Sequence, residues 1–371
     1  MSAIRPSLLA LFCSAAAIVS AQPTFAASLP TAAPGYAVSV FAAGVAGSYS
    51  APDSIAVYDE HIFIGYGDGN LPDGSDGKST QVVQYSMSGA VEWVYNVKGH
   101  QDGLKVDPYE HFVWALQNED ANPNAVAINY KTHTQSAPFT FAAPTPHGGG
   151  YDDIVFRAGK VYLSASNPAN NPNTKPAIVQ ATIGSGNTIN VTPVLMGNAQ
   201  ATNVVTGATV TLNLQDPDSM TLDPSGDLFM TSQGDGEIVI VRKPGSTEQS
   251  VLLVPLTSPW GTPMVDDTVF TPAEDGYILV ADKDADTVYA IRKTVFAPGS
   301  AYSAAQATEG SNTVGFVGKL DVEYGLLTPV ITNMSNPGGM AFVRTNQDDS
   351  ALEEVLDFCN AISAFTGNPL N

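Results

Sequence analysis

Residues 216–232 read Asp-Pro-Asp-Ser-Met-Thr-Leu-Asp-Pro-Ser-Gly-Asp-Leu-Phe-Met-Thr-Ser, and this stretch decides the fold. An aspartate and a small residue open a short run of alternating apolar side chains. A Pro-Ser-Gly-Asp turn follows, and a second apolar run comes after it. Short runs of alternating apolar and polar residues are typical of β-strands. The turn residues between the two runs predict a hairpin.

The same unit recurs along the chain. Five copies begin with Asp followed by a small residue or a second Asp, at Asp53, Asp102, Asp152, Asp218 and Asp266. A sixth copy begins at Gly338 and lacks the aspartate. Second strands are expected at 61–65, 112–116, 161–165, 228–232 and 277–281, and third strands at 81–85, 237–241 and 287–291. Repeated strand-turn-strand units of about 40–50 residues predict a β-propeller, because one such sheet cannot bury both of its faces alone.

The expected fold is therefore all-β: a propeller of six blades with one abbreviated, five or seven being the alternatives. We expect the strand at 35–41 to complete the last blade and close the ring. The polar or small-residue stretches 167–173, 199–207 and 296–311 are expected to be surface loops. Residues 351–359 place Leu352, Val355, Leu356 and Cys359 on one helical face, which predicts a short C-terminal helix.

Composition and the N-terminus restrict the partners and the location. The 371 residues include 36 acidic and 15 basic ones, a net charge of −21. No Lys/Arg cluster is present, which excludes nucleic-acid binding and a polybasic membrane-surface role. Arg5, the apolar run 8–19 and the small residues after it predict a signal peptide at 1–26. We therefore expect a propeller at 27–347, a helical tail at 348–371, no membrane span after signal removal, and a secreted or periplasmic protein.

The repeat also predicts a ring of carboxylates. The innermost strand of each blade runs along the central channel, so its opening residue lies near the channel mouth. Five carboxylates around one axis repel each other unless they are protonated or neutralised by a cation. Oxygen ligands favour a hard cation, Ca²⁺ ahead of Mg²⁺. The alternative is that each Asp accepts backbone N–H groups and only stabilises its turn. The predicted metal ligands are Asp53, Asp102, Asp152, Asp218 and Asp266.

Further polar residues precede the inner strands and should lie at the same mouth. His100 and His147 could act as general bases or ligands, because neutral imidazole does either near pH 7, or be hydrogen-bonded loop residues. With Asp218 they are the catalytic candidates. Trp260 could be an aromatic platform for a sugar or apolar ligand, or pack at the rim. The predicted ligand-binding residues are Trp260, Asp216 and Asn336.

The units around Asp218 and Tyr277 resemble blades of six-bladed propellers of the NHL-repeat and gluconolactonase-like (senescence marker protein) groups. The resemblance covers most of residues 35–345 and rests on the blade pattern. It implies a divalent cation held in the channel by a Glu, an Asn and an Asp. Asp218, in Asp-Ser-Met, matches the family's Asp in Asp-Gly-Met, and Asp102-Gly-Leu has the same form. Asp53 stands where the family has Glu, and its Asn has no clear match.

Two functions follow as hypotheses. The first is a secreted hydrolase in which the cation polarises a lactone or ester carbonyl, and a carboxylate, His100 or His147 activates water. The second is a non-catalytic propeller that binds a small-molecule or carbohydrate-like ligand, or a protein partner, around a structural ion. An isomerase or lyase on the same scaffold is a more distant third.

Overall fold

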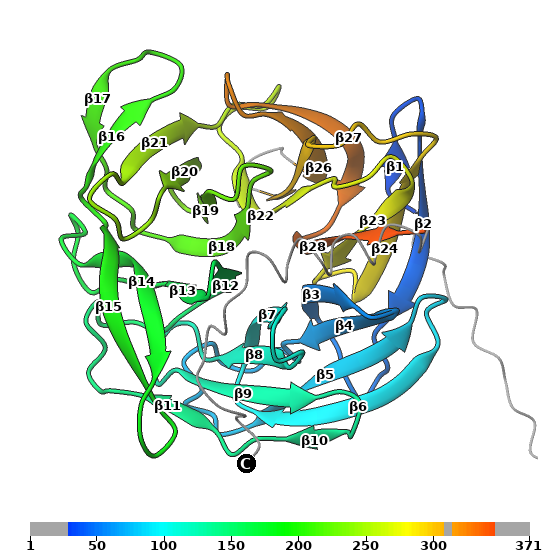
Figure 1. Cartoon of the computed structure of the whole chain (residues 1–371). Coiled ribbons are helices and arrows are strands. Elements are labelled where there is room, and N and C mark those ends of the chain that lie inside the picture. Colours follow the sequence, from blue (N-terminus) through cyan, green and yellow to red (C-terminus); the bar gives the residue numbers. More distant parts are fainter. Residues whose placement is uncertain (1–28, 308–313, 346–371) are drawn as a thin grey trace, which may run out of the picture.

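Six short strands surround the axis of the molecule (Figure 1). In this computed structural model, which describes residues 29–307 and 314–345, each of the six contacts the next and the last contacts the first. They are β3 (Pro52–Tyr58), β7 (Gln101–Val106), β12 (Ile154–Arg157), β18 (Pro217–Leu222), β22 (Met264–Phe270) and β28 (Pro337–Arg344). The described part of the chain is all β-strand and loop, and the closed ring makes it a propeller, as predicted.

The first four inner strands carry sheets in chain order. The β3 sheet continues with β4 (His61–Tyr66), β5 (Ser79–Ser86) and β6 (Val91–Lys98). The β7 unit holds β8 (Val113–Gln117), β9 (Asn124–Asn129), β10 (Thr134–Gln135) and β11 (Phe139–Phe141). The β12 unit holds β13 (Lys160–Ser164), β14 (Pro176–Ile183) and β15 (Thr188–Met196). The parallel β11–β15 pair joins these two units into one nine-stranded sheet.

The β18 sheet contains an addition that the sequence did not predict. It continues with β19 (Leu228–Ser232), β20 (Glu237–Arg242) and β21 (Ser250–Pro255). A hairpin of β16 (Gln200–Asn203) and β17 (Thr209–Thr211) extends its outer edge, since β16 pairs in parallel with β21. The stretch 199–207, expected to be a loop, therefore contributes a strand.

The last two sheets exchange strands, and this corrects the predicted strand order. The hairpin of β23 (Gly276–Asp282) and β24 (Thr287–Lys293) pairs with β28 and not with β22. The chain then returns to β22 with β25 (Ala301–Gln306), β26 (Gly315–Asp321) and β27 (Leu326–Met334). The sheet on β28 has four strands, because the β23–β24 hairpin and β2 join it.

The stretch 296–311 is not the expected surface loop, because it contains β25. Ala304 and Ala305 in this strand are fully buried, between β22 on one side and β26 on the other. A strand packed on both faces favours small side chains where neighbouring sheets approach closely. The Ala/Ser composition that indicated a loop is here the composition of a tightly packed strand.

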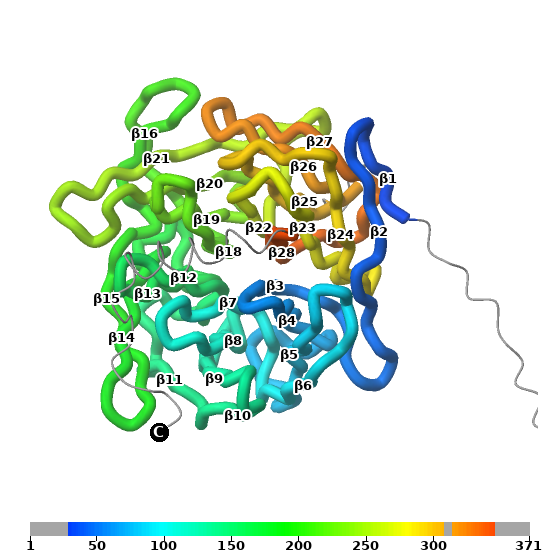
Figure 2. Tube along the Cα trace, turned by 45° about the vertical axis from the view of Figure 1, so that its right-hand side comes forward, coloured from blue at the N-terminus to red at the C-terminus, as the bar shows by residue number. Residues whose placement is uncertain are grey.

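The N-terminal strand closes the ring, as predicted. β2 (Tyr36–Ala43) pairs antiparallel with β24, with Val38 opposite Ile291, and forms the outer edge of the β28 sheet. β1 (Thr31–Ala32) pairs with β27 of the adjacent sheet. Figure 2 shows both strands running along the outside of the last two sheets. The predicted signal peptide and C-terminal helix lie outside the described residues.

Apolar packing holds neighbouring sheets together. Six buried clusters each draw side chains from two adjacent units, and together they encircle the axis. The cluster between the last and first sheets, for example, joins Leu279 and Val288 to Ile62 and Ile64. Burial of apolar area, at about 25 cal/mol per Å², therefore stabilises the contacts between sheets around the whole ring.

The repeated Asp-X pair forms a β-bulge. On β18, Pro217 lies opposite Ser232 and Met220 opposite Met230, so two inner-strand residues face one residue of β19. The register shifts in the same way at the corresponding pairs of β3, β7, β22 and β28. A bulge of this kind bends the strand and redirects side chains. Because of this bulge, the side chains of two consecutive residues can point in different directions.

In four of the six units, the second residue of the pair makes a hydrogen bond with the next unit around the ring. The Ser54 hydroxyl donates to the carbonyl of Asp102, and Gly103 N donates to the carbonyl of Asp152 at 2.8 Å. In two later units, a carboxylate makes the equivalent contact. Asp153 accepts from Met220 N at 2.9 Å, and Asp267 accepts from Met340 N at 2.7 Å. These polar contacts join neighbouring inner strands at four of the six junctions around the ring.

Gly103→Ala should test this close approach. A Cβ atom at Gly103 would lie 2.2 Å from the carbonyl oxygen of Asp152, so we expect a loss of about 3 kcal/mol or more in the free energy of unfolding. Urea denaturation measures it. The control is Gly186→Ala, where φ is +70° and the space is open, which should cost about 1–2 kcal/mol. Equal losses for the two variants would contradict the account.

Candidate functional site

The five repeated aspartates meet at one cavity on the axis. Asp53, Asp102, Asp152, Asp218 and Asp266 all line it, together with Lys105 and the second residues of the bulges. Its volume, counted as space open to the centre of a water-sized sphere, is about 20 Å³. One water needs roughly 10–15 Å³ on this measure, so the cavity accommodates a water or a small ion.

The partners of these carboxylates differ around the ring. Asp53 accepts from Nζ of Lys283 at 2.9 Å. Asp266 accepts from the side-chain amides of Gln233 and Gln306 at 3.0 and 2.8 Å. No hydrogen bond from a backbone amide to a carboxylate of the five is recorded among the described residues. The alternative in which each Asp only stabilises its own turn therefore does not describe this site.

The remaining arc consists of Asp102, Asp152 and Asp218, on three successive inner strands. Oδ2 of Asp102 is buried and has no hydrogen-bond partner among the described residues. The carboxyl groups of Asp152 and Asp218 interact with each other, and such a pair is favourable only when one of the two carries a proton. In the described part of the chain, no lysine or amide group donates a hydrogen bond to the carboxyl groups of this arc, in contrast to Asp53 and Asp266.

Burial raises the pKa of Asp102, Asp152, Asp218 and Asp266 well above the ordinary range of an aspartate. The charge of a neighbouring carboxylate raises each pKa further: Asp152 acts on Asp102, and Asp218 acts on Asp152. Two like charges close together in a low-dielectric site cannot both be ionised cheaply. The ring therefore binds protons readily, as it would bind any cation that fits.

Two lysines supply positive charge, and the sequence analysis missed both. Lys283 lies in the β23–β24 hairpin, which the repeat assigned to the wrong sheet. Lys105 lies on β7, at a place where the other inner strands have small, apolar or hydroxyl side chains, and that contrast was a usable signal. Its Nζ lies 2.9 Å from Oδ2 of Asp153. Although burial lowers the pKa of Lys105, Asp153 and Asp267 raise it overall.

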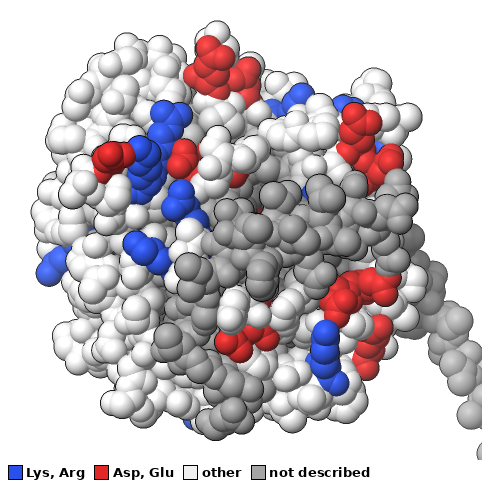
Figure 3. Space-filling model, in the orientation of Figure 1, with Lys and Arg blue, Asp and Glu red and all other residues white. Residues whose placement is uncertain are grey.

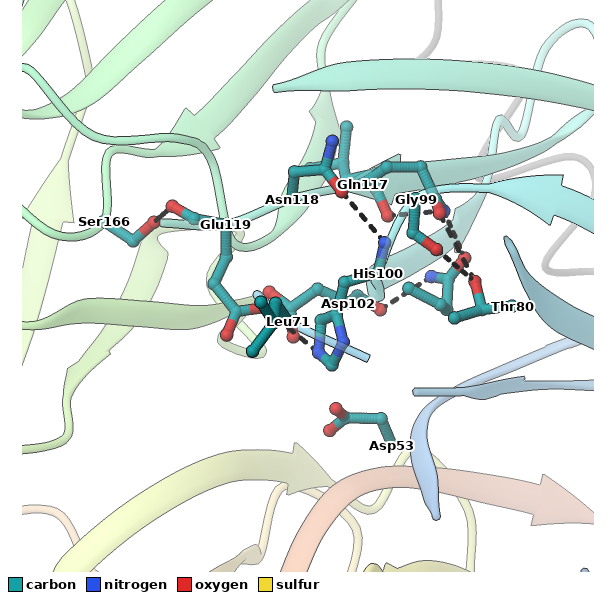
Figure 4. Close-up of polar contacts among 12 residues, drawn as sticks. Asp53, Leu71, Thr80, Gly99, His100, Asp102, Gln117, Asn118, Glu119 and Ser166 are labelled. Carbon is teal, nitrogen blue, oxygen red and sulfur yellow. Dashed lines mark hydrogen bonds and ion pairs between the residues drawn. The ribbon is translucent and has the colours of Figure 1, made fainter. Parts of the chain in front are cut away.

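A histidine and a glutamate face the ring from the β7–β8 unit. Figure 4 shows His100 and Glu119 pointing toward the space that Asp53 faces from β3. Nε2 of His100 lies 3.7 Å from Oε2 of Glu119. Both ring nitrogens of His100 are buried without a hydrogen-bond partner in the described chain. Burial lowers the pKa of His100, and burial with the charge of Asp53 raises that of Glu119 to about 7.

The backbone around this pair is held firmly. His100 N donates to Oδ1 of Asn118 at 2.9 Å, and Asn118 N donates to the carbonyl of His100 at 2.9 Å. The carbonyl of Glu119 accepts from Gly150 N at 2.8 Å and from the Ser166 hydroxyl. Glu119 was missed because it follows a second strand, β8, and not an inner one.

His147 and Asp216 have structural partners of their own. His147 is fully buried, its Nε2–H donates to the carbonyl of Gly150 at 2.5 Å, and burial lowers its pKa to about 4. It does not line the axial cavity, and its role as a catalytic base stays a prediction. Asp216 accepts from Gly234 N at 2.8 Å, and burial raises its pKa.

Trp260 and Asn336 also lie apart from the cavity lining. Trp260 is 44% exposed and packs edge-on against Phe316, with ring centroids 5.1 Å apart. Asn336 uses its backbone: its N–H donates to Asp282 at 2.7 Å and its carbonyl accepts from Lys283 N at 2.9 Å. Asn336 therefore positions the loop that carries Lys283.

The donor set fits a hard cation in its chemistry. The ring offers carboxylate oxygens, one of them buried and unpartnered, around a cavity of ionic size that Lys105 also lines. Among the described residues, no three His, Cys, Asp or Glu side chains converge on one point as a closed metal site requires. Binding would therefore require Asp102, Asp152 and Asp218 to turn toward a common centre as their shared proton leaves.

Comparison with known proteins concerns the fold. No protein-family model and no curated protein matches the chain. The periplasmic gluconolactonase PpgL of Pseudomonas aeruginosa matches 80% of this chain and 89% of its own, with 11% identity and a TM-score of 0.45. Virginiamycin B lyase of Staphylococcus aureus matches 69% of this chain and 99% of its own, with 11% identity and a TM-score of 0.43. A protein of unknown function from Bacteroides caccae matches 79% of this chain and 86% of its own, with 9% identity and a TM-score of 0.48.

Charges of both signs are mixed on one face of the molecule. On the face in Figure 3, Lys and Arg side chains stand singly or in small groups, with acidic groups beside and between them.

Within residues 29–307 and 314–345, no helix is both long enough and apolar enough to cross a bilayer.

Asp218→Asn should raise stability at high pH in chelator-treated protein. A carboxyl group whose pKa is higher in the folded than in the unfolded state stabilises the fold at low pH and loses that contribution as the pH rises. The variant should therefore melt higher than wild type at pH 8, by about 2–4 °C per kcal/mol. The difference should shrink as the pH falls toward 4. The exposed Asp284→Asn is the control, and a pH-independent difference would contradict the assignment.

Proposed function

We propose that the protein is a secreted or periplasmic propeller hydrolase that binds a divalent cation at its carboxylate ring and acts on a lactone or ester. One observation carries the proposal: five carboxylates from successive inner strands line a single cavity of ionic size, and Oδ2 of Asp102 is buried there without a hydrogen-bond partner in the described chain. The sequence resemblance to gluconolactonase-like propellers supports the same reaction class.

Asp102, Asp152 and Asp218 would hold the cation, with Ca²⁺ ahead of Mg²⁺. When bound there, such an ion polarises a substrate carbonyl at the mouth of the channel. Asp53 and Asp266 contribute negative charge, but Lys283 and two glutamine amides already bind them. The ligand set is therefore the unpartnered arc and not the whole ring.

His100 and Glu119 are the groups that can move a proton at the mouth. Burial keeps the His100 imidazole neutral near pH 7 by lowering its pKa, so a ring nitrogen can accept a proton from water. Glu119, with a pKa of about 7 and 3.7 Å away, can take up or return that proton. The clamped backbone of both residues keeps the pair in place.

The small volume of the cavity supports a second candidate function, that of a non-catalytic propeller. At about 20 Å³ it has no room for an organic substrate, so any substrate must sit outside it. A non-catalytic propeller, in which the ion stabilises the ring and the ligand or protein partner binds elsewhere, fits that observation.

The cation can be tested through stability. We expect Ca²⁺ at about 100 times its Kd to stabilise the wild type by about 2.7 kcal/mol, and chelator to reverse the shift in Tm. Asp102→Asn, Asp152→Asn and Asp218→Asn should each abolish this shift, because each removes a ligand of the arc. Asp284→Asn should retain it. If neither Ca²⁺ nor chelator changes the Tm of the wild type, both cation-based functions are wrong.

Hydrolysis separates the two functions. On a panel of lactones and esters, the wild type should turn over at least one substrate. Glu119→Gln should lower kcat by about 10²–10⁴-fold, the range of general acid–base catalysis, while still binding Ca²⁺. Asp284→Asn should keep full activity. Ca²⁺ binding without hydrolysis of any panel member would favour the non-catalytic propeller.

A further inference from the structure

The sixth sector of the ring supplies a lysine where the other five supply aspartates. At the aligned position stands Gly338, which has no side chain and whose Cβ would lie 3.2 Å from Oδ2 of Asp266. The sheet built on β28 also contains the β23–β24 hairpin, and this hairpin carries Lys283. Nζ of Lys283 lies 2.9 Å from Oδ2 of Asp53.

Hydrogen bonds fix the backbone from which Lys283 extends. Asp282 is buried and accepts from Ser335 N at 2.9 Å and from Asn336 N at 2.7 Å. Lys283 N in turn donates to the carbonyl of Asn336 at 2.9 Å. These hydrogen bonds join the hairpin to the loop before β28. Lys283 lies beside the ring because the β23–β24 hairpin pairs with β28 and not with β22.

The environment keeps the ammonium group charged. The carboxylate of Asp53 raises the pKa of Lys283, and the charges of Glu119 and Asp102 raise it further. In return Lys283 lowers the pKa values of Asp102, Asp266 and Glu119. The side chain is about one-third exposed. Lys105 differs, because it pairs with the buried Asp153.

We propose that Lys283 is a built-in counter-cation of the ring, which competes with a bound divalent cation and so weakens the affinity of the site. The inference rests on the cation-binding part of the proposed function and not on hydrolysis. A positive charge beside the ring repels an incoming cation and occupies Asp53, which could otherwise join Asp102, Asp152 and Asp218. The chain thus limits how tightly its carboxylates hold an ion.

Calorimetric titration of chelator-washed protein with Ca²⁺ tests this. Lys283→Met should bind Ca²⁺ about tenfold more tightly than wild type, or more, because one opposing charge is removed. Lys283→Arg keeps the charge and should bind like wild type. Lys319→Met, an exposed lysine on β26, is the matched control and should also bind like wild type. Circular dichroism confirms that each variant is folded.

A second measurement needs no metal. In chelator-washed protein, Lys283→Met should lower Tm, because Asp53 loses its partner, and adding Asp53→Asn should restore most of the loss. Ca²⁺ should then raise the Tm of Lys283→Met by more than that of wild type.

Several results would overturn the inference. They are unchanged or weaker Ca²⁺ binding by folded Lys283→Met, no Ca²⁺ binding by either protein, or a Lys283→Arg variant that behaves like Lys283→Met. Tight binding by Lys283→Met with no hydrolysis of any lactone or ester would uphold the inference and reject the hydrolase.

Discussion

The structure depends on a two-residue bulge repeated on the inner strands. Where two residues face one residue of the next strand, consecutive side chains need not alternate across the sheet. The first residue of each pair can point at the axis while the second contacts the neighbouring inner strand. The repeat that places the five aspartates at the axis therefore also closes the ring. As a result, the site and the stability of the fold depend on the same repeated pair.

Concentrating carboxylates on one axis creates an electrostatic problem that the chain solves only in part. Lys105 pairs with Asp153 beneath the ring, and Lys283 pairs with Asp53 beside it. Glutamine amides satisfy Asp266. The arc of Asp102, Asp152 and Asp218 is left to share protons or to bind a cation. A buried carboxylate without a partner is costly, so this arc is where function is to be sought.

Much of this could be read from the sequence, because the Asp-X pair and the strands that flank it are local patterns. The convergence of five aspartates follows from the repeat, and the closing role of β2 follows from its position before the first repeat. The exchange of β23–β24 does not, since a hairpin has the same sequence pattern whichever inner strand it joins. That ambiguity hid Lys283, whereas the Ala/Ser composition of β25 led this strand to be predicted as a loop. Glu119 lies on a connection that carries no repeat signal, and burial of His147 depends on packing around Gly150 that no local pattern reveals.

Carbon-13 NMR of the aspartate carboxyl groups, followed against pH in metal-free protein, tests the central claim most directly. If the inner-strand carboxylates share one axis, the resonances of Asp102, Asp152 and Asp218 will titrate well above the usual value of about 3.9, in overlapping steps that change together when one is replaced by Asn. Independent titration of all three near 3.9 would show that they do not interact, and the account of the site would be wrong.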